Sequence, residues 1–161
     1  MIVVTDTSVV LNLCCLHLEN LLSDLFGTVL APPTVAQEFK RLASVDIRFR
    51  SLTFPAFIQI TAPMKIPSTL AGNQKLHAGE IDALSLAVGK KTDAVLMDER
   101  AGRDAAADLG LRCIGILGVL IQAKTIGLLT QIRPLLDQLE SQAGFWIGPT
   151  LRTRVLGIVS E

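Results

Sequence analysis

Two acidic residues stand where apolar β-strands are expected to end. The run from Ile2 to Thr5 is followed by Asp6, and the run from Ala94 to Met97 is followed by Asp98. Short apolar runs of this kind are typical of strands buried on both faces. The carboxyl ends of parallel strands meet at one edge of a sheet, where ligands usually bind. Alternatively, each aspartate is the N-cap of the helix that follows it.

Two glutamates lie on expected helices, at different distances from the apolar face. In the helix expected over residues 79–91, a step of 100° per residue places Glu80 inside the apolar arc and Asp82 opposite it. A carboxylate on a buried face is costly unless a cation or a hydrogen-bond donor meets it. In the helix expected over residues 34–43, Glu38 lies at the border of the apolar arc.

The four acids together predict a metal site. Asp6, Glu38, Glu80 and Asp98 are placed to converge at one edge of one sheet, and no lysine or arginine close in sequence neutralises the first three. Clustered carboxylates repel one another unless a divalent cation is present. Oxygen ligands without cysteine or histidine suit Mg²⁺ or Mn²⁺. A site of this kind is suited to phosphoryl chemistry.

The order of the elements predicts the fold that positions these acids. Strands are expected over residues 2–5, 27–31, 57–61, 94–97 and 112–114, and helices over residues 9–25 (with a break near 15–17), 34–43, 79–91, 99–109, 117–125 and 132–142. Alternating strands and helices indicate an α/β fold with a mostly parallel sheet and helices on both faces. We expect residues 1–161 to form one domain.

Composition limits what the protein can bind. Half of the residues are apolar, and 15 basic residues balance 15 acidic ones. The chain should therefore fold around its own hydrophobic core. Because its net charge is zero, it cannot bind nucleic acid through an overall positive charge. Aromatic residues make up only 4%, which argues against base-stacking platforms. Because half of the chain is apolar, we expect it to bury part of its surface in a homodimer. The expected two-fold interface lies on the first two helices, at Val9, Val10, Leu13, Leu21 and Leu22.

The cysteines and the apolar runs predict a cytoplasmic protein. Cys14, Cys15 and Cys113 have neither a disulfide pattern nor the spacing of a metal site, which fits buried thiols in a reducing compartment. No signal peptide is expected, because Asp6 stands where its apolar segment would begin. The apolar runs are shorter than the roughly 20 residues that a membrane span needs.

The ordered motifs resemble a known family. V-T-D-T-S at 4–8, the Glu38 helix after A-P-P, G-E-I-D-A-L-S-L-A at 79–87 and L-M-D-E-R at 96–100 resemble the PIN-domain nucleases. D-E-R-A-G-R-D-A-A at 98–106, G-I-L-G-V-L-I-Q-A-K at 115–124 and P-L-L-D-Q-L at 134–139 resemble the PIN-like subfamily DUF3368. The resemblance implies a three-layer α/β/α PIN-like fold with a mostly parallel central sheet.

The resemblance also implies an activity and partners. It implies a metal-dependent endoribonuclease that hydrolyses RNA through a Mg²⁺ or Mn²⁺ site, acting as a VapC-like toxin with an antitoxin protein. Asp6, Glu38, Glu80 and Asp98 match the family's acidic, catalytic positions, and the first, third and fourth of these would ligate the metal. Ser8 matches the small hydroxyl or amide residue found two positions after the first aspartate, which supports the site directly or through water.

One segment departs from the VapC pattern. VapC toxins usually carry a T-N-D-x-D-F-like sequence after the fourth strand, whereas this chain has M-D-E-R-A-G-R at 97–103. Glu99 either supplies the missing carboxylate or caps the following helix. Arg103 matches an arginine of the subfamily, and it either contacts a substrate phosphate or pairs with an acid of the site. The departure supports an alternative function, a catalytically weak PIN-like module that binds a partner protein or RNA.

The remaining candidates have simpler interpretations. His17 and His77 are not at any metal-ligand spacing, and we expect no catalytic work from them. Trp146 is expected in the core or in an interface rather than on a base-stacking surface. A dehalogenase-like phosphatase would need a second aspartate at position 8, where the chain has Ser8.

Overall fold

A five-stranded sheet forms the centre of the protein in the computed structural model, which describes residues 1–161. All neighbouring strands are parallel, in the order β3-β2-β1-β4-β5. The strands are β1 (Ile2–Thr5), β2 (Thr28–Ala31), β3 (Gln59–Ile60), β4 (Ala94–Leu96) and β5 (Cys113–Ile114). Each lies within one of the five predicted strand segments.

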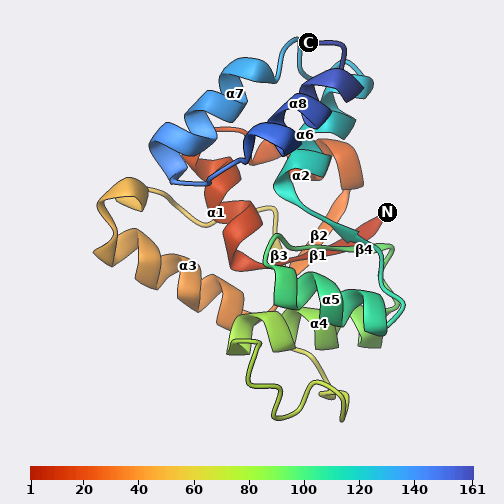
Figure 1. Cartoon of the computed structure of the whole chain (residues 1–161). Helices are drawn as coiled ribbons and strands as arrows, with labels where there is room; N and C mark the ends of the chain where they lie inside the picture. The colour runs from red at the N-terminus through yellow and green to blue at the C-terminus, as the bar shows by residue number, and fades with distance from the viewer.

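Eight α-helices cover the sheet. They are α1 (Thr7–Cys15), α2 (Asn20–Phe26), α3 (Pro33–Val45), α4 (Ala78–Lys90), α5 (Arg100–Asp108), α6 (Ile116–Thr125), α7 (Arg133–Gln138) and α8 (Pro149–Ile158). A short 3₁₀ turn at Ile47–Phe49 follows α3, and a π-helical turn at Leu139–Ala143 follows α7. Helices α4 and α5 lie together on one face of the sheet, and α1, α6, α7 and α8 lie on the other (Figure 1). The predicted three-layer α/β/α PIN-like fold is therefore confirmed.

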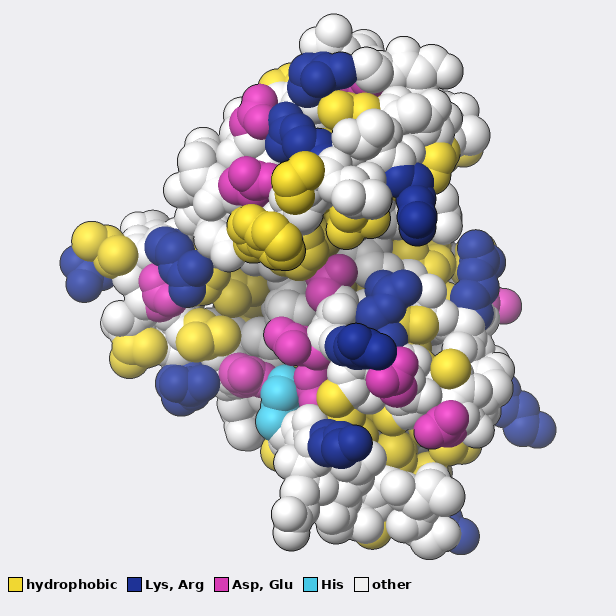
Figure 2. All heavy atoms as spheres, viewed as in Figure 1, with side chains coloured by type: hydrophobic (Ala, Val, Ile, Leu, Met, Phe, Trp, Pro, Cys, Tyr) yellow, Lys and Arg dark blue, Asp and Glu magenta, His cyan; other side chains and the backbone are white.

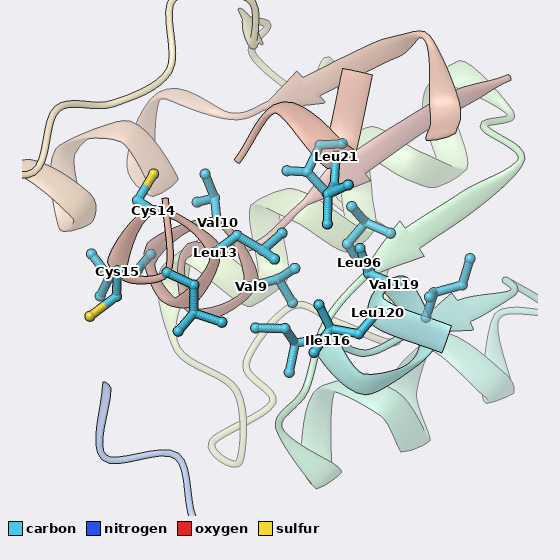
Figure 3. Close-up of a cluster of buried hydrophobic side chains, with 14 of the residues drawn as sticks. Val9, Val10, Leu13, Cys14, Cys15, Leu21, Leu96, Ile116, Val119 and Leu120 are labelled. Atoms are coloured by element: carbon cyan, nitrogen blue, oxygen red, sulfur yellow. The ribbon is translucent and has the colours of Figure 1, made fainter. Parts of the chain in front are cut away.

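Alternate residues of the central strands pack into two separate hydrophobic cores. Val3 of β1 belongs to a cluster of 31 buried residues with α1, α2 and α6, whereas Val4 belongs to a cluster of 12 with α4 and α5. This alternation follows from the side-chain period of a strand. Figure 3 shows part of the larger core, where side chains of α1 and α6 meet near Leu96 of β4. Burial on both faces explains why the central strands read as continuous apolar runs.

The predicted dimer interface is wrong in its residues. All five side chains assigned to it are buried in the larger core of a single chain, and all but Leu21 have no exposed surface. Eight of the nine residues of α1 are buried, so this helix has no free apolar face. Any dimer must use another surface. Of the two places expected for Trp146, the core is wrong, since the residue is 79% exposed, and an interface stays a prediction.

The segment predicted as one broken helix forms two. Helix α1 ends at Cys15, and His17 has a positive φ of 57°, a backbone conformation that ends a helix. Helix α2 then starts at Asn20. Beyond the last helix expected from the sequence, Pro149–Ile158 forms α8, with Pro149 in its first turn. No single helix has both the length and the apolar composition to cross a membrane, although the sharply bent α1–α2 pair does when both helices are counted together.

Candidate active site

Asp6 joins the end of β1 to the start of α1. Its backbone N–H donates to the Leu96 carbonyl of β4 at 3.0 Å, and its Oδ1 accepts from the Val9 N–H at 3.0 Å. The Ser8 hydroxyl donates to the same carboxylate, at 3.1–3.2 Å from its two oxygens. The Asp6 residue is only 2% exposed. The N-cap that was the alternative interpretation of Asp6 is therefore present, and Ser8 orients its carboxylate.

Glu80 faces inward, as its helical position predicts. The residue is 2% exposed and lies in the first turn of α4, whose N-cap is His77. Glu80 Oε2 accepts from the His77 N–H at 3.2 Å, and the Glu80 N–H donates to His77 Nδ1 at 3.3 Å. These two bonds form a capping box in which histidine takes the usual place of serine or threonine.

His77 is the site residue that the sequence interpretation missed. Because its Nδ1 accepts a hydrogen bond, the ring proton lies on Nε2, and Nε2 is 3.3 Å from Glu80 Oε1. The same ring places Nδ1 3.9 Å from Glu38 Oε2. The available signal was local: an acceptor side chain stands three residues before a glutamate at the start of a helix.

Glu38 reaches the site from α3. Its Oε2 accepts from the Thr7 hydroxyl of α1 at 2.9 Å, so two helices hold one carboxylate. A Cβ atom at Gly79 would lie 3.1 Å from that oxygen, which shows how closely Glu38 approaches the start of α4. Its side chain is 28% exposed, in agreement with the predicted border position.

Asp98 follows β4 at the same edge of the sheet as Asp6. Thr5 of β1 pairs with Leu96 of β4, so both aspartates lie beyond the carboxyl ends of neighbouring strands, as predicted. Asp98 does not cap the helix that directly follows it. Its Oδ1 instead accepts from the Ile116 N–H at 2.9 Å, at the start of α6, while its Oδ2 is buried with no hydrogen-bond partner.

Glu99 and Arg103 lie on opposite sides of this aspartate. Glu99 is the N-cap residue of α5, but its side chain makes no capping hydrogen bond. It lines a surface hollow together with Asp6 and Glu38. Arg103 Nη1 donates to the Met97 carbonyl at 3.4 Å, and the nearby guanidinium lowers the pKa of Asp98. A Cβ at Gly115 would lie 2.5 Å from Asp98 Oδ1 and 2.8 Å from Arg103 Nη1, so a glycine is needed where these two side chains meet α6.

Burial and the neighbouring carboxylates raise the pKa of Asp6, Glu80 and Asp98. Burial raises the pKa of Asp6 to about 8, and the charges of Asp98 and Glu80 add to the effect against the opposing bonds from Val9 and Ser8. Burial likewise raises the pKa of Asp98 to about 6. The pKa of Glu80 is raised by burial, with Glu99 and Glu38 adding to it. A divalent cation would favour the charged forms of all these groups.

Three of the acids, Asp6, Glu38 and Glu99, line a hollow on the protein surface. A cavity of about 320 Å³ is lined by Asp6, Ser8, Glu38, His77 and Glu99, among others. Figure 2 shows acidic side chains and a histidine gathered at the centre of this face, with Lys and Arg on one side and hydrophobic side chains above. Asp98 lines an adjoining cavity together with Arg103.

The donors suit a divalent cation that prefers oxygen ligands. As the side chains stand, no three His, Cys, Asp or Glu residues lie together closely enough to hold an ion. Two observations nevertheless fit a bound cation: Asp98 Oδ2 is buried without a hydrogen-bond partner, and the charges of Asp98 and Glu80 add to the burial that raises the pKa of Asp6. Whether these three share a metal remains a prediction.

Comparison with known proteins gives one match. A family model described as DUF3368, PIN domain, matches residues 2–161. No curated protein and no solved structure matches the chain.

Proposed function

Because the chain belongs to the DUF3368 family of PIN domains, we propose that it is a metal-dependent endoribonuclease that hydrolyses RNA phosphodiesters. PIN domains are generally nucleases, and they generally use divalent metals such as Mg²⁺. The observation that carries the proposal is that Asp6 and Asp98 follow neighbouring strands and that the charges of Asp98 and Glu80 reach Asp6, whose pKa is raised by burial and by these charges. That arrangement favours a bound cation.

The proposed roles follow from the contacts of each side chain. Asp6, Glu80 and Asp98 would hold Mg²⁺ or Mn²⁺, which supplies the positive charge that lowers the pKa of water and stabilises the charge on phosphate. Ser8 fixes the Asp6 carboxylate, and the Ile116 N–H fixes one oxygen of Asp98. Ligands that are already oriented by hydrogen bonds lose little freedom when they bind a metal or a substrate.

Glu38 is the acid best placed to move a proton. Its Oε2 accepts a hydrogen bond from the Thr7 hydroxyl, whereas its Oε1 takes no part in that bond. The side chain is partly exposed at the hollow. A general base must reach the water that attacks phosphorus. In the proposed reaction, Glu38 Oε1 accepts the proton of that water while the RNA 3′-oxygen leaves.

The cellular role that we propose is the toxin of a toxin–antitoxin pair. The DUF3368 family assignment and the resemblance to VapC toxins support it. The partners would be an RNA substrate, a cognate antitoxin protein and a second copy of the chain, in the cytoplasm.

Cleavage of single-stranded RNA by the purified protein tests the proposal. With Mn²⁺, the parent should cleave internal phosphodiesters, a chelator should stop cleavage, and Asp6→Asn should lower the rate by orders of magnitude. The matched control is Asp104→Asn, which removes an exposed carboxylate on α5, outside the site. Cleavage that is equal in the parent and in Asp6→Asn would refute the assignment.

One observation favours a second candidate function. The carboxylates do not form a three-ligand group in the present arrangement, which is what a catalytically weak module that binds a partner protein or RNA would have. In that case the parent would bind RNA or a partner but would show neither Mn²⁺ stabilisation nor Asp6-dependent cleavage.

A further inference from the structure

A second cavity adjoins the acidic site on the β5 side. Its volume is about 510 Å³, and it lies between the end of β5, the first turns of α6 and the segment that leads into α8. Its lining includes Asp98, Arg103, Arg112, Gln122, Phe145 and Leu151. Asp98 belongs both to this cavity and to the acidic site, so whatever binds in the cavity lies next to the proposed reaction centre.

Two arginines give the cavity the chemistry of a phosphate site. Neither Arg103 nor Arg112 forms an ion pair, although five other basic or histidine side chains are paired or lie near a carboxylate. Arg112 is exposed, and it directly precedes β5. Guanidinium groups match phosphate oxygens in charge and in planar geometry. Asp98 is the only acid in the lining.

The opposite wall is apolar and carries an aromatic ring. Phe145 is half-buried against the larger core and contributes to the cavity together with Leu151 of α8. Trp146 follows it in the chain, is 79% exposed, and lies over Gly148, where an added Cβ would come within 3.2 Å of the ring. An aromatic face beside cationic groups is the combination that binds an unstacked base together with its phosphate.

We propose that this cavity binds one nucleotide of a single-stranded RNA, next to the phosphodiester held at the acidic site. Arg112 and Arg103 hold the phosphate of that nucleotide, and Phe145 contacts its base. The inference rests on the proposed nuclease function and adds to it a subsite that orients the strand. It agrees with the expectation that the chain has no base-stacking platform of several aromatic residues, since it assigns contact with a base to a single residue.

Binding without turnover tests the phosphate contact. In the Asp6→Asn background, a short single-stranded RNA is titrated, and the fluorescence of Trp146 is followed; it is the only tryptophan, and the chain has no tyrosine. Arg112→Gln should weaken binding and should lower the slope of log affinity against log salt by about 0.7, the value for one lost phosphate contact on a single strand. The matched control is Arg50→Gln, which removes the same charge from an exposed residue outside the cavity.

Abasic substitutions test the base contact. Oligonucleotides that lack one base at successive positions should show one position at which affinity for the parent falls about fivefold or more. Phe145→Leu keeps an apolar side chain. In this variant, removal of the base at that position should lower the affinity no more than removal at other positions. Arg112 is exposed, so its variant keeps the fold even if Phe145→Leu is destabilised.

The outcomes separate the subsite from the nuclease function. Equal affinity and equal salt slope for Arg112→Gln and Arg50→Gln would overturn the subsite, and so would a parent that binds no RNA. Arg112-dependent binding by a parent that never cleaves RNA would instead overturn the nuclease function and leave the subsite standing.

Discussion

Asp6 serves the fold and the site with the same carboxylate. It caps α1 through the Val9 N–H, and it lies within electrostatic reach of Asp98 and Glu80. A plain N-cap is usually exposed, where its charge interacts favourably with the helix dipole at little cost. Asp6 is buried instead, and its raised pKa shows that the capping bond does not fully offset that burial. This excess cost is the residue-scale argument for a bound cation.

Stability of the metal-free protein should therefore fall as pH rises. Asp6 has an ordinary pKa of 3.8 and a pKa of about 8 in the folded protein, so the folded state keeps a proton that the unfolded state loses. This contribution to stability is complete below about pH 4 and is lost as pH rises toward 8. With a chelator present, we expect the melting temperature to be roughly 5 °C or more lower at pH 8 than at pH 5.

Asp6→Asn is the control for this pH dependence. The amide does not titrate and still caps a helix, so most of the fall should disappear in the variant, leaving the smaller contribution of Asp98 between about pH 4 and 6. Thermal melts of both proteins across this range measure the difference. Parallel curves for the two proteins would show that Asp6 is not the titrating group.

At the scale of elements, the sequence predicted where each acid stands but not what holds it. Strand ends and helical periodicity placed Asp6, Glu80 and Asp98 correctly, because both depend on local repeats. The partner of Asp98 was not predictable, since Ile116 lies 18 residues away and its amide reaches the carboxylate only through the packing of α6 against the sheet. The start of α4 was predicted within one residue, but its N-cap, His77, was missed because the segment before it lacks any periodic pattern.

The His77 cap of α4 gives an element-scale prediction. His77→Ala removes the acceptor for the Glu80 N–H and should destabilise the protein by about 1 kcal/mol. His77→Asn keeps a capping acceptor and should restore most of that stability. Urea denaturation of the three proteins measures the effect. If the alanine and asparagine variants were equally stable, the capping role of His77 would be disproved.

At the scale of the whole molecule, the apolar residues fill two hydrophobic cores and do not form the dimer interface that was predicted on α1 and α2. A sheet covered on both faces needs two clusters, of 31 and 12 buried residues, and α1 is enclosed almost completely by the larger one. Composition counts apolar residues without showing which of them face a partner. The order of strands and helices was predictable, whereas the enclosure of α1 and α2 depends on α6, α7 and α8 folding over them.

The homodimer itself remains a prediction, now with a different interface. Apolar side chains that are exposed in the single chain, such as Val45, Ile47 and Trp146, are the ones available to a partner copy. Solution scattering at several concentrations should give a mass of twice 17.3 kDa. A mass of one chain at every concentration would contradict this prediction, and it would leave the acidic site unaffected, because every side chain placed there comes from one chain.

The melting temperature of the parent and of Asp6→Asn, with and without Mn²⁺ at neutral pH, tests the central claim most directly. A ligand that binds only the folded state stabilises it in proportion to its affinity. Mn²⁺ should therefore raise the melting temperature of the parent clearly and that of Asp6→Asn little. Without metal, the variant should be as stable as the parent or more so, since its amide need not take up a proton on folding at neutral pH. An equal Mn²⁺ shift in both proteins would remove Asp6 from the metal site and contradict the account.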